Sequence, residues 1–204
     1  MARQVLSTVE IALVLIVPLI LFYQRSTWRV KGYWKTVVLL YALWFATYAF
    51  FHELSHLIGA SMTGCHVIDY RLIPRFWLGD FYDAWVKATW DSGYKGFIST
   101  MAPYLRDVVL SILGLLLMKK VGRARRFVAG LLLVSCVLSP IYDVVNNVSI
   151  YLCGNFAGND FDNLAGIVGG IWASVIALSF CGLVIAPAIG VYRICRPDEK
   201  PQAI

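Results

Sequence analysis

Long apolar runs, separated by short polar stretches, dominate the pattern of this chain. Five such runs cover about residues 6–23, 36–60, 97–118, 127–148 and 164–192. A helix needs about 20 apolar residues to cross a bilayer, and each run reaches or nearly reaches that length. The pattern predicts an all-α membrane protein with about five transmembrane helices.

One segment, residues 64–95, departs from this pattern because it mixes charged side chains with Tyr, Phe and Trp. Residues 67–73 alternate partially between apolar and polar side chains, which predicts a short β-strand after the second helix. The aromatic stretch at residues 76–90 indicates an interfacial or re-entrant element. A further membrane passage hidden in this segment would make six spans.

Composition supports a membrane location. Hydrophobic residues make up 59% of the 204 residues and charged residues 15%, with a mean hydropathy of +0.70. Soluble domains are roughly half apolar and a quarter charged. The net charge of +6 comes from basic residues in short loops between apolar runs. We therefore expect lipid headgroups of the bilayer, and no nucleic acid, as partners of these charges.

The second apolar run contains the sequence His52-Glu53-Leu54-Ser55-His56. Two histidines four residues apart lie on one face of a helix, where their imidazole nitrogens can share one tetrahedral metal. Glu53 projects beside them and is placed to take a proton from water. The motif predicts one Zn²⁺ per chain, held by His52 and His56, with Glu53 as the catalytic base. The alternative, a polar helix end that faces water, would bring ionisable groups costing roughly 2.5–3.5 kcal/mol each into an apolar run.

A catalytic zinc needs a third protein ligand, and Asp143 is the first candidate. It lies deep in the fourth apolar run, where a carboxylate is costly unless it binds something. Asn146 and Asn147 would share its helical face and could hold a substrate strand or orient the ligand. The alternative for Asp143 is a buried salt bridge with Arg106. Asp160 is the reserve third ligand, and otherwise a solvated loop charge.

Three motifs in order along the chain resemble a known family. They are the His52–His56 motif, residues 101–105 (MAPYL) at the start of the next span, and residues 140–143 (PIYD) two spans after the zinc helix. Together they look like the site-2 protease group of intramembrane zinc metalloproteases, especially its small M50B-like members. The resemblance implies zinc ligands at His52, His56 and Asp143 and a catalytic role for Glu53. The chain departs from the family pattern at Ala102, Arg106 and Val144.

The resemblance implies a zinc-dependent intramembrane endopeptidase that hydrolyses a peptide bond in or near a transmembrane segment of a protein substrate. Tyr104 or Arg106 is a candidate donor to the oxyanion. The chain would form one domain over residues 1–204, with an anchor span and basic loop at 1–35, a catalytic core at 36–165, and a last span with a basic tail at 166–204. The oligomeric state stays open.

Two other classes of function stay open. One is a metal-binding membrane transporter, although no inverted repeat is visible. The other is a non-proteolytic, chaperone-like relative, against which Glu53 argues because a structural metal site needs no base.

Loop charges predict the orientation. Four Lys or Arg residues lie in the first loop, five in the third and three in the tail, all on one side of a five-span arrangement. The positive-inside rule puts the tail in the cytosol and the zinc site toward the exterior or lumenal side. Site-2 proteases as a group open their zinc toward the cytosol; an inverted relative or a sixth passage within residues 64–95 would reconcile the two.

Overall fold

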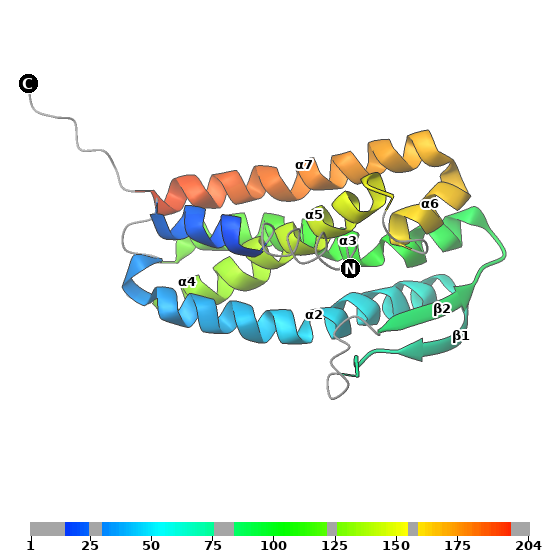
Figure 1. The fold of residues 1–204 in the computed structure, drawn as a ribbon, viewed down its shortest axis with the longest axis horizontal. Coiled ribbons are helices and arrows are strands. Elements are labelled where there is room, and N and C mark those ends of the chain that lie inside the picture. Colours follow the sequence, from blue (N-terminus) through cyan, green and yellow to red (C-terminus); the bar gives the residue numbers. More distant parts are fainter. Residues whose placement is uncertain (1–14, 25–29, 76–83, 122–125, 155–158, 197–204) are drawn as a thin grey trace, which may run out of the picture.

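The computed structural model describes residues 15–24, 30–75, 84–121, 126–154 and 159–196, and they form a bundle of long helices with a small β-hairpin at one end (Figure 1). The elements in chain order are α2 (Trp34–Thr63), β1 (His66–Arg71), β2 (Trp85–Thr89), α3 (Gly93–Lys120), α4 (Arg126–Leu133), α5 (Ser139–Leu152), α6 (Asp160–Val168) and α7 (Gly170–Cys195). The described residues are consistent with the predicted all-α architecture, and the small two-stranded sheet lies where a short β segment was predicted after the second helix.

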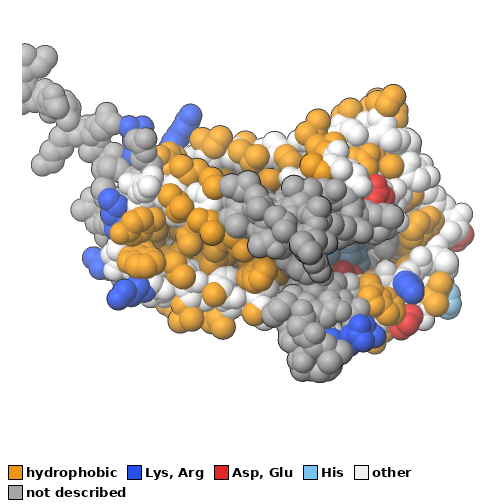
Figure 2. Space-filling view, viewed as in Figure 1, with side chains coloured by type: hydrophobic (Ala, Val, Ile, Leu, Met, Phe, Trp, Pro, Cys, Tyr) orange, Lys and Arg blue, Asp and Glu red, His pale blue; other side chains and the backbone are white. Residues whose placement is uncertain are grey.

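Four helices in the described part of the chain are long and apolar enough to cross a membrane: Lys31–Thr63, Gly93–Lys120, Arg126–Leu152 and Gly170–Cys195. Their flanks expose apolar side chains, among them Leu39 and Leu178. Figure 2 shows exposed apolar side chains along one face of the bundle. Of the first predicted run, residues 15–24 form a short apolar helix, and the rest lies outside the described residues. Four of the five predicted spans are therefore confirmed as long apolar helices.

The third long helix changes geometry in its middle. A π-helical turn, Val134–Leu138, joins α4 to α5, and Pro140 follows two residues later. Proline has no N–H to donate to the carbonyl four residues earlier, and its ring crowds that carbonyl. A π-helical turn before a proline accommodates the missing hydrogen bond and the crowded carbonyl without ending the helix.

The last predicted span, residues 164–192, is confirmed as a long apolar helix only from Gly170 onward, because its first residues belong to a separate short helix. α6 ends at Val168 and α7 begins at Gly170, and between them Gly169 adopts φ = +88°, a conformation that favours glycine. Phe161 and Leu164 pack α6 against the bundle, because both are fully buried in a cluster with Tyr104 and Val184. The N-terminal residue of α6, Asp160, is thus fixed against the bundle rather than lying in a loop.

β1 and β2 form an antiparallel hairpin that folds back along α2 (Figure 1). The predicted strand at 67–73 is confirmed as β1, with an irregularity in its pairing between Val67 and Asp69. The interfacial element predicted at 76–90 is wrong for its last part, because Trp85–Thr89 is the second strand; residues 76–83 lie outside the described residues. Ala84, directly before β2, lines a cavity together with Glu53, so this end of the hairpin lies beside the middle of α2 rather than at its last residue.

Candidate metal centre

His52 and His56 lie on the same face of α2, as their spacing predicts. Both side chains are buried, and their ring centroids are 4.9 Å apart. Their Nε2 atoms are separated by 3.3 Å. The two nitrogens therefore face a common point.

The ring of His56 is oriented by the neighbouring helix. Gly59 lets α3 approach closely, because a Cβ at this position would lie 2.7 Å from the Cβ of Ala102. This approach brings the Nδ1 of His56 within 2.8 Å of the carbonyl oxygen of Ser99. A carbonyl only accepts hydrogen bonds, so Nδ1 carries the proton and donates it. The Nε2 atom of a neutral His56 is then left with a free lone pair.

His52 is oriented in the same way by a carboxylate. Its Nδ1 lies 2.9 Å from Oδ1 and 3.0 Å from Oδ2 of Asp143, which is fully buried on α5. An ionised carboxylate only accepts, so Nδ1 of His52 is the donor, and its Nε2 also keeps a lone pair when the ring is neutral. This pairing of a carboxylate with the rear nitrogen of an imidazole is typical of metal-binding histidines.

Asp160 completes the group from the N-terminus of α6. Its Oδ2 lies 3.1 Å from Nε2 of His52 and 3.3 Å from Nε2 of His56, and Tyr104 donates its hydroxyl proton to the same oxygen at 2.7 Å. Burial alone would raise the pKa of Asp160, but the contacts with His56 and His52 outweigh it and hold the pKa well below its usual range. Asp160 is therefore a carboxylate.

The spacing of these three atoms fits a metal ion. Bonds of 2.0–2.1 Å at tetrahedral angles place zinc ligands roughly 3.3 Å apart. The three separations are 3.1, 3.3 and 3.3 Å. With both rings neutral, two lone pairs and a carboxylate oxygen converge without a hydrogen-bond donor among them, and either a metal ion between the three atoms or a proton on one ring supplies the missing positive charge. His52, His56 and Asp160 form a group that could hold a metal ion.

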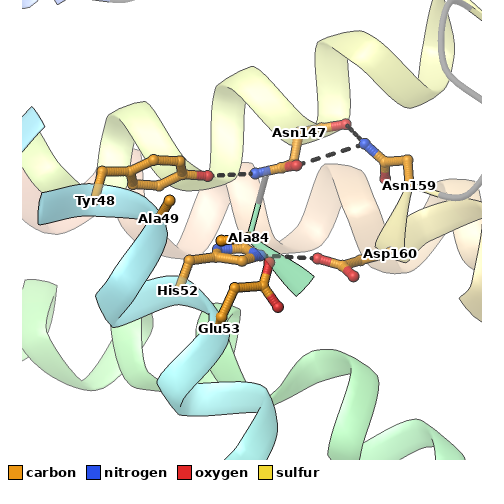
Figure 3. A pocket seen from close by; sticks show the side chains of 8 residues that line it. All are labelled: Tyr48, Ala49, His52, Glu53, Ala84, Asn147, Asn159 and Asp160. Carbon is orange, nitrogen blue, oxygen red and sulfur yellow. Dashed lines mark hydrogen bonds and ion pairs between the residues drawn. The ribbon is translucent and has the colours of Figure 1, made fainter. Parts of the chain in front are cut away.

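Glu53 lies beside His52 on α2 (Figure 3) and lines two cavities. One cavity, of about 180 Å³, is lined by Glu53 and Asp160 together with Tyr48, Asn147 and Asn159. A second, of about 330 Å³, is lined by the same two carboxylates together with His56, residues of β2, and Trp90. Water or a ligand in either cavity can therefore reach Glu53 and the edge of the metal group.

Behind His52, a buried polar network surrounds Asp143. Arg106 donates from Nη2 to Oδ2 of Asp143 at 2.7 Å, and Tyr48 donates its hydroxyl proton to Oδ1 at 3.0 Å. The amide of Asn147 donates to the same Oδ1 at 3.0 Å and to the Tyr48 hydroxyl oxygen at 3.1 Å. Each Asp143 oxygen thus has a protein donor, and the carboxylate is well compensated for its burial.

The predicted site residues fall into three positions. His52, His56 and the reserve ligand Asp160 converge on one point, with Glu53 and Tyr104 at its edge. Asp143, Asn147 and Arg106 lie behind His52, and the salt bridge with Arg106, which was the alternative interpretation of Asp143, is present. Asn146 is buried on the same helix as Asn147 but is not among the residues that line the two cavities at Glu53. That Asp143 binds the metal directly and that Arg106 meets an oxyanion stay predictions.

Sequence reasoning missed three residues of the site: Tyr48, Ser99 and Asn159. Asn159 caps α6, its Oδ1 accepting from the Phe161 amide at 2.8 Å, and the polar pair Asn-Asp before an apolar run is a helix-start signal that could have been read. Tyr48 lies one turn before His52 and could have been assigned to its face. Ser99 acts through its backbone, which no sequence pattern marks.

Comparisons with protein-family models, with curated proteins and with solved structures give no match for this chain. The class to which it belongs is thus defined by its own fold and site. It is a helical protein whose long apolar helices could cross a membrane. Two histidines of α2 and an aspartate at the start of α6 form a candidate metal group inside the helix bundle.

Proposed function

We propose that the protein is a zinc-dependent endopeptidase of the site-2 protease kind, which hydrolyses a peptide bond in or near a transmembrane segment of another protein. The observation that carries the proposal is the spacing of the two Nε2 atoms and Oδ2 of Asp160, together with Glu53 beside them. Imidazole nitrogen with carboxylate oxygen is a donor set that suits zinc.

In this proposal His52, His56 and Asp160 hold the zinc, and Asp143 orients His52 from behind. Zinc at such a site supplies Lewis acidity, which makes water a better nucleophile and polarises a carbonyl. Glu53 accepts the proton of the attacking water and passes it to the leaving amide nitrogen. Tyr104 keeps Asp160 in place through its 2.7 Å hydrogen bond.

The hairpin supports a binding mode for the substrate backbone. β1 pairs with one edge of β2, and in the described residues no strand pairs with the other edge. Residues of β2 line the larger cavity with Glu53 and Asp160. An extended peptide can pair with a free strand edge through its main chain. A transmembrane substrate helix would have to unwind first, because helical amides are already hydrogen-bonded.

The depth of the site supports a membrane substrate. Glu53 lies about 15 Å along α2 from its last residue, at 1.5 Å per residue. At that depth a transmembrane segment can arrive sideways between helices, whereas a soluble peptide has to cross the apolar surroundings of the site.

The basic side chains at one end of the bundle are the basis for the orientation in the membrane that we propose. Basic side chains gather at the end of the bundle where α2 begins and α7 ends (Figure 2), namely Lys31, Lys35, Lys119, Lys120, Arg126, Arg193 and Arg196. The positive-inside rule assigns this end to the cytosol and the hairpin end to the exterior or lumen.

The test compares the wild type with Glu53→Gln. Purified wild-type protein should contain one zinc per chain and cleave, in proteoliposomes, a membrane protein that accumulates in cells carrying Glu53→Gln. Glu53→Gln should keep the zinc and lose the cleavage, because it removes the base and none of the ligands. If all candidate substrates stay intact, and if ion movement or partner binding is equal in the two forms, a transporter or a chaperone-like protein replaces the peptidase.

A further inference from the structure

The guanidinium of Arg106 joins three helices at the rear of the metal group. From α3 it donates to Oδ2 of Asp143 on α5, and to the carbonyl oxygen of Phe51 and Oγ of Ser55 on α2, at 2.7, 2.7 and 2.9 Å. Its Nε and Nη2 also donate to Oδ1 of its neighbour Asp107, at 2.9 and 2.8 Å. These contacts occupy the whole donor fork of an arginine, which has five N–H groups.

The points that Arg106 holds on α2 are adjacent to the two histidines. Phe51 directly precedes His52, and Ser55 directly precedes His56. The third point, Asp143, is the carboxylate that receives the Nδ1 proton of His52. One side chain therefore holds both the backbone that carries the histidines and the group that sets the tautomer of one of them.

The position of Arg106 also separates it from the Glu53 side of the site. The cavity that Arg106 lines, of about 240 Å³, is bounded by Trp44, Phe51, Leu110, Ser135 and Ser139, with Tyr48 as the wall shared with the Glu53 side. Glu53 and Asp160 line the two cavities described above, and His56 lines the larger of them. With its donors occupied on the far side of His52, Arg106 has none to offer a reacting carbonyl beside Glu53.

We infer that Arg106 is a positioning residue of the metal centre, which fixes His52 and His56 through Asp143 and the α2 backbone and does not contact substrate. The inference rests on the proposed metal site but not on peptidase activity, because metal affinity is its first readout. Loss of a group that supports a metal ligand typically costs about 10- to 100-fold in metal affinity.

The test uses Arg106→Lys, which keeps the positive charge beside Asp107 and Asp143. A lysine ammonium has three donors on one atom and cannot span all four partners. We expect Arg106→Lys to raise the dissociation constant for Zn²⁺, measured in detergent by chelator competition, by about 10- to 100-fold. The visible absorption spectrum of the Co²⁺-loaded protein should also change, because it reports the ligand geometry.

Two further variants serve as a control and as a substitute for a variant that does not fold. Arg193→Gln removes an exposed guanidinium at the other end of the bundle and should leave both the Zn²⁺ affinity and the Co²⁺ spectrum unchanged. If Arg106→Lys does not fold, the double variant Arg106→Gln/Asp107→Asn removes one positive and one negative charge together and should show the same loss of affinity.

The outcomes separate the inference from the proposed function. Wild-type affinity and an unchanged Co²⁺ spectrum in Arg106→Lys would overturn the inference alone. So would a variant with normal metal binding and a reduced kcat, since that pattern belongs to an oxyanion donor. A wild type that binds no metal would overturn the metal site and the inference together.

Discussion

Asn159 donates a hydrogen bond from Nδ2 to the main-chain oxygen of Asn147 at 3.2 Å, so the residue before Asp160 is tied to α5. The same side chain caps α6 through the Phe161 amide. The carboxylate that approaches the two histidines is thus placed by a neighbour with two anchors, one on its own helix and one on another.

Replacement of Asn159 by alanine should loosen α6. Loss of an N-cap costs about 1 kcal/mol, and here the tie to α5 is lost as well. Hydrogen exchange followed by mass spectrometry should detect faster exchange of the α6 amides and little change in α3. Asn163→Ala, an exposed position on the same helix, is the control. Equal exchange in the two variants would contradict this role of Asn159.

Replacement of Gly59 by alanine should separate α2 from α3. The new methyl group would lie 2.7 Å from the Cβ of Ala102, and overpacking of this kind costs about 1–3 kcal/mol. The hydrogen bond from His56 to Ser99 would lengthen, so we expect a lower melting temperature and weaker zinc binding.

Gly182→Ala is the matched control for this substitution, because nothing lies within 4 Å of a Cβ at that position of α7. It should leave both the melting temperature and the zinc affinity close to those of the wild type. The same result for Gly59→Ala would show that α2 and α3 can move apart without effect on the site.

Zinc binding by two aspartate variants should separate a ligand from an orienting group. Asp160→Asn is expected to abolish stoichiometric zinc, because the amide is a poor ligand at the point where both Nε2 atoms converge. Asp143→Asn is expected to lower the affinity by about 10- to 100-fold and to keep a measurable site. The opposite order, measured by elemental analysis and competition titration, would restore Asp143 as the third ligand.

Cysteine labelling in intact cells should reveal the orientation. On a background without native cysteines, a membrane-impermeant reagent should label Met62→Cys, at the hairpin end of α2, and not Lys120→Cys, at the end of α3. The loop charges are the reason for this expectation. Labelling of Lys120→Cys alone would place the hairpin end in the cytosol, as in site-2 proteases generally.

The long helices, His52 and His56 could be predicted because the sequence features that indicate them lie within a short stretch of the chain. Apolar runs of helix length stand out in any sequence, and the spacing of His52 and His56 is one turn of a helix. The burial of Asp143 was also predictable, because a carboxylate in an apolar run needs partners. Periodicity could not decide between a metal and Arg106 as that partner, since both satisfy the same charge.

The sequence alone could not identify Asp160 as the third residue of the metal group, because its position depends on how segments far apart in the chain fold together. It is separated from His56 by 104 positions, and its approach depends on the break at Gly169, which turns the start of an apparent span into a separate short helix. The Gly169-Gly170 pair is typical of a break in a helix, but the apolar residues on both sides of it favoured the prediction of one continuous span.

Ala84, directly before β2, lines both cavities beside Glu53 and Asp160, so the two cavities meet at the same three residues. A bulkier side chain at position 84 would therefore narrow both approaches to the metal group at once. If the protein cuts peptides at this point, the size of this one side chain limits how bulky a peptide the site accepts.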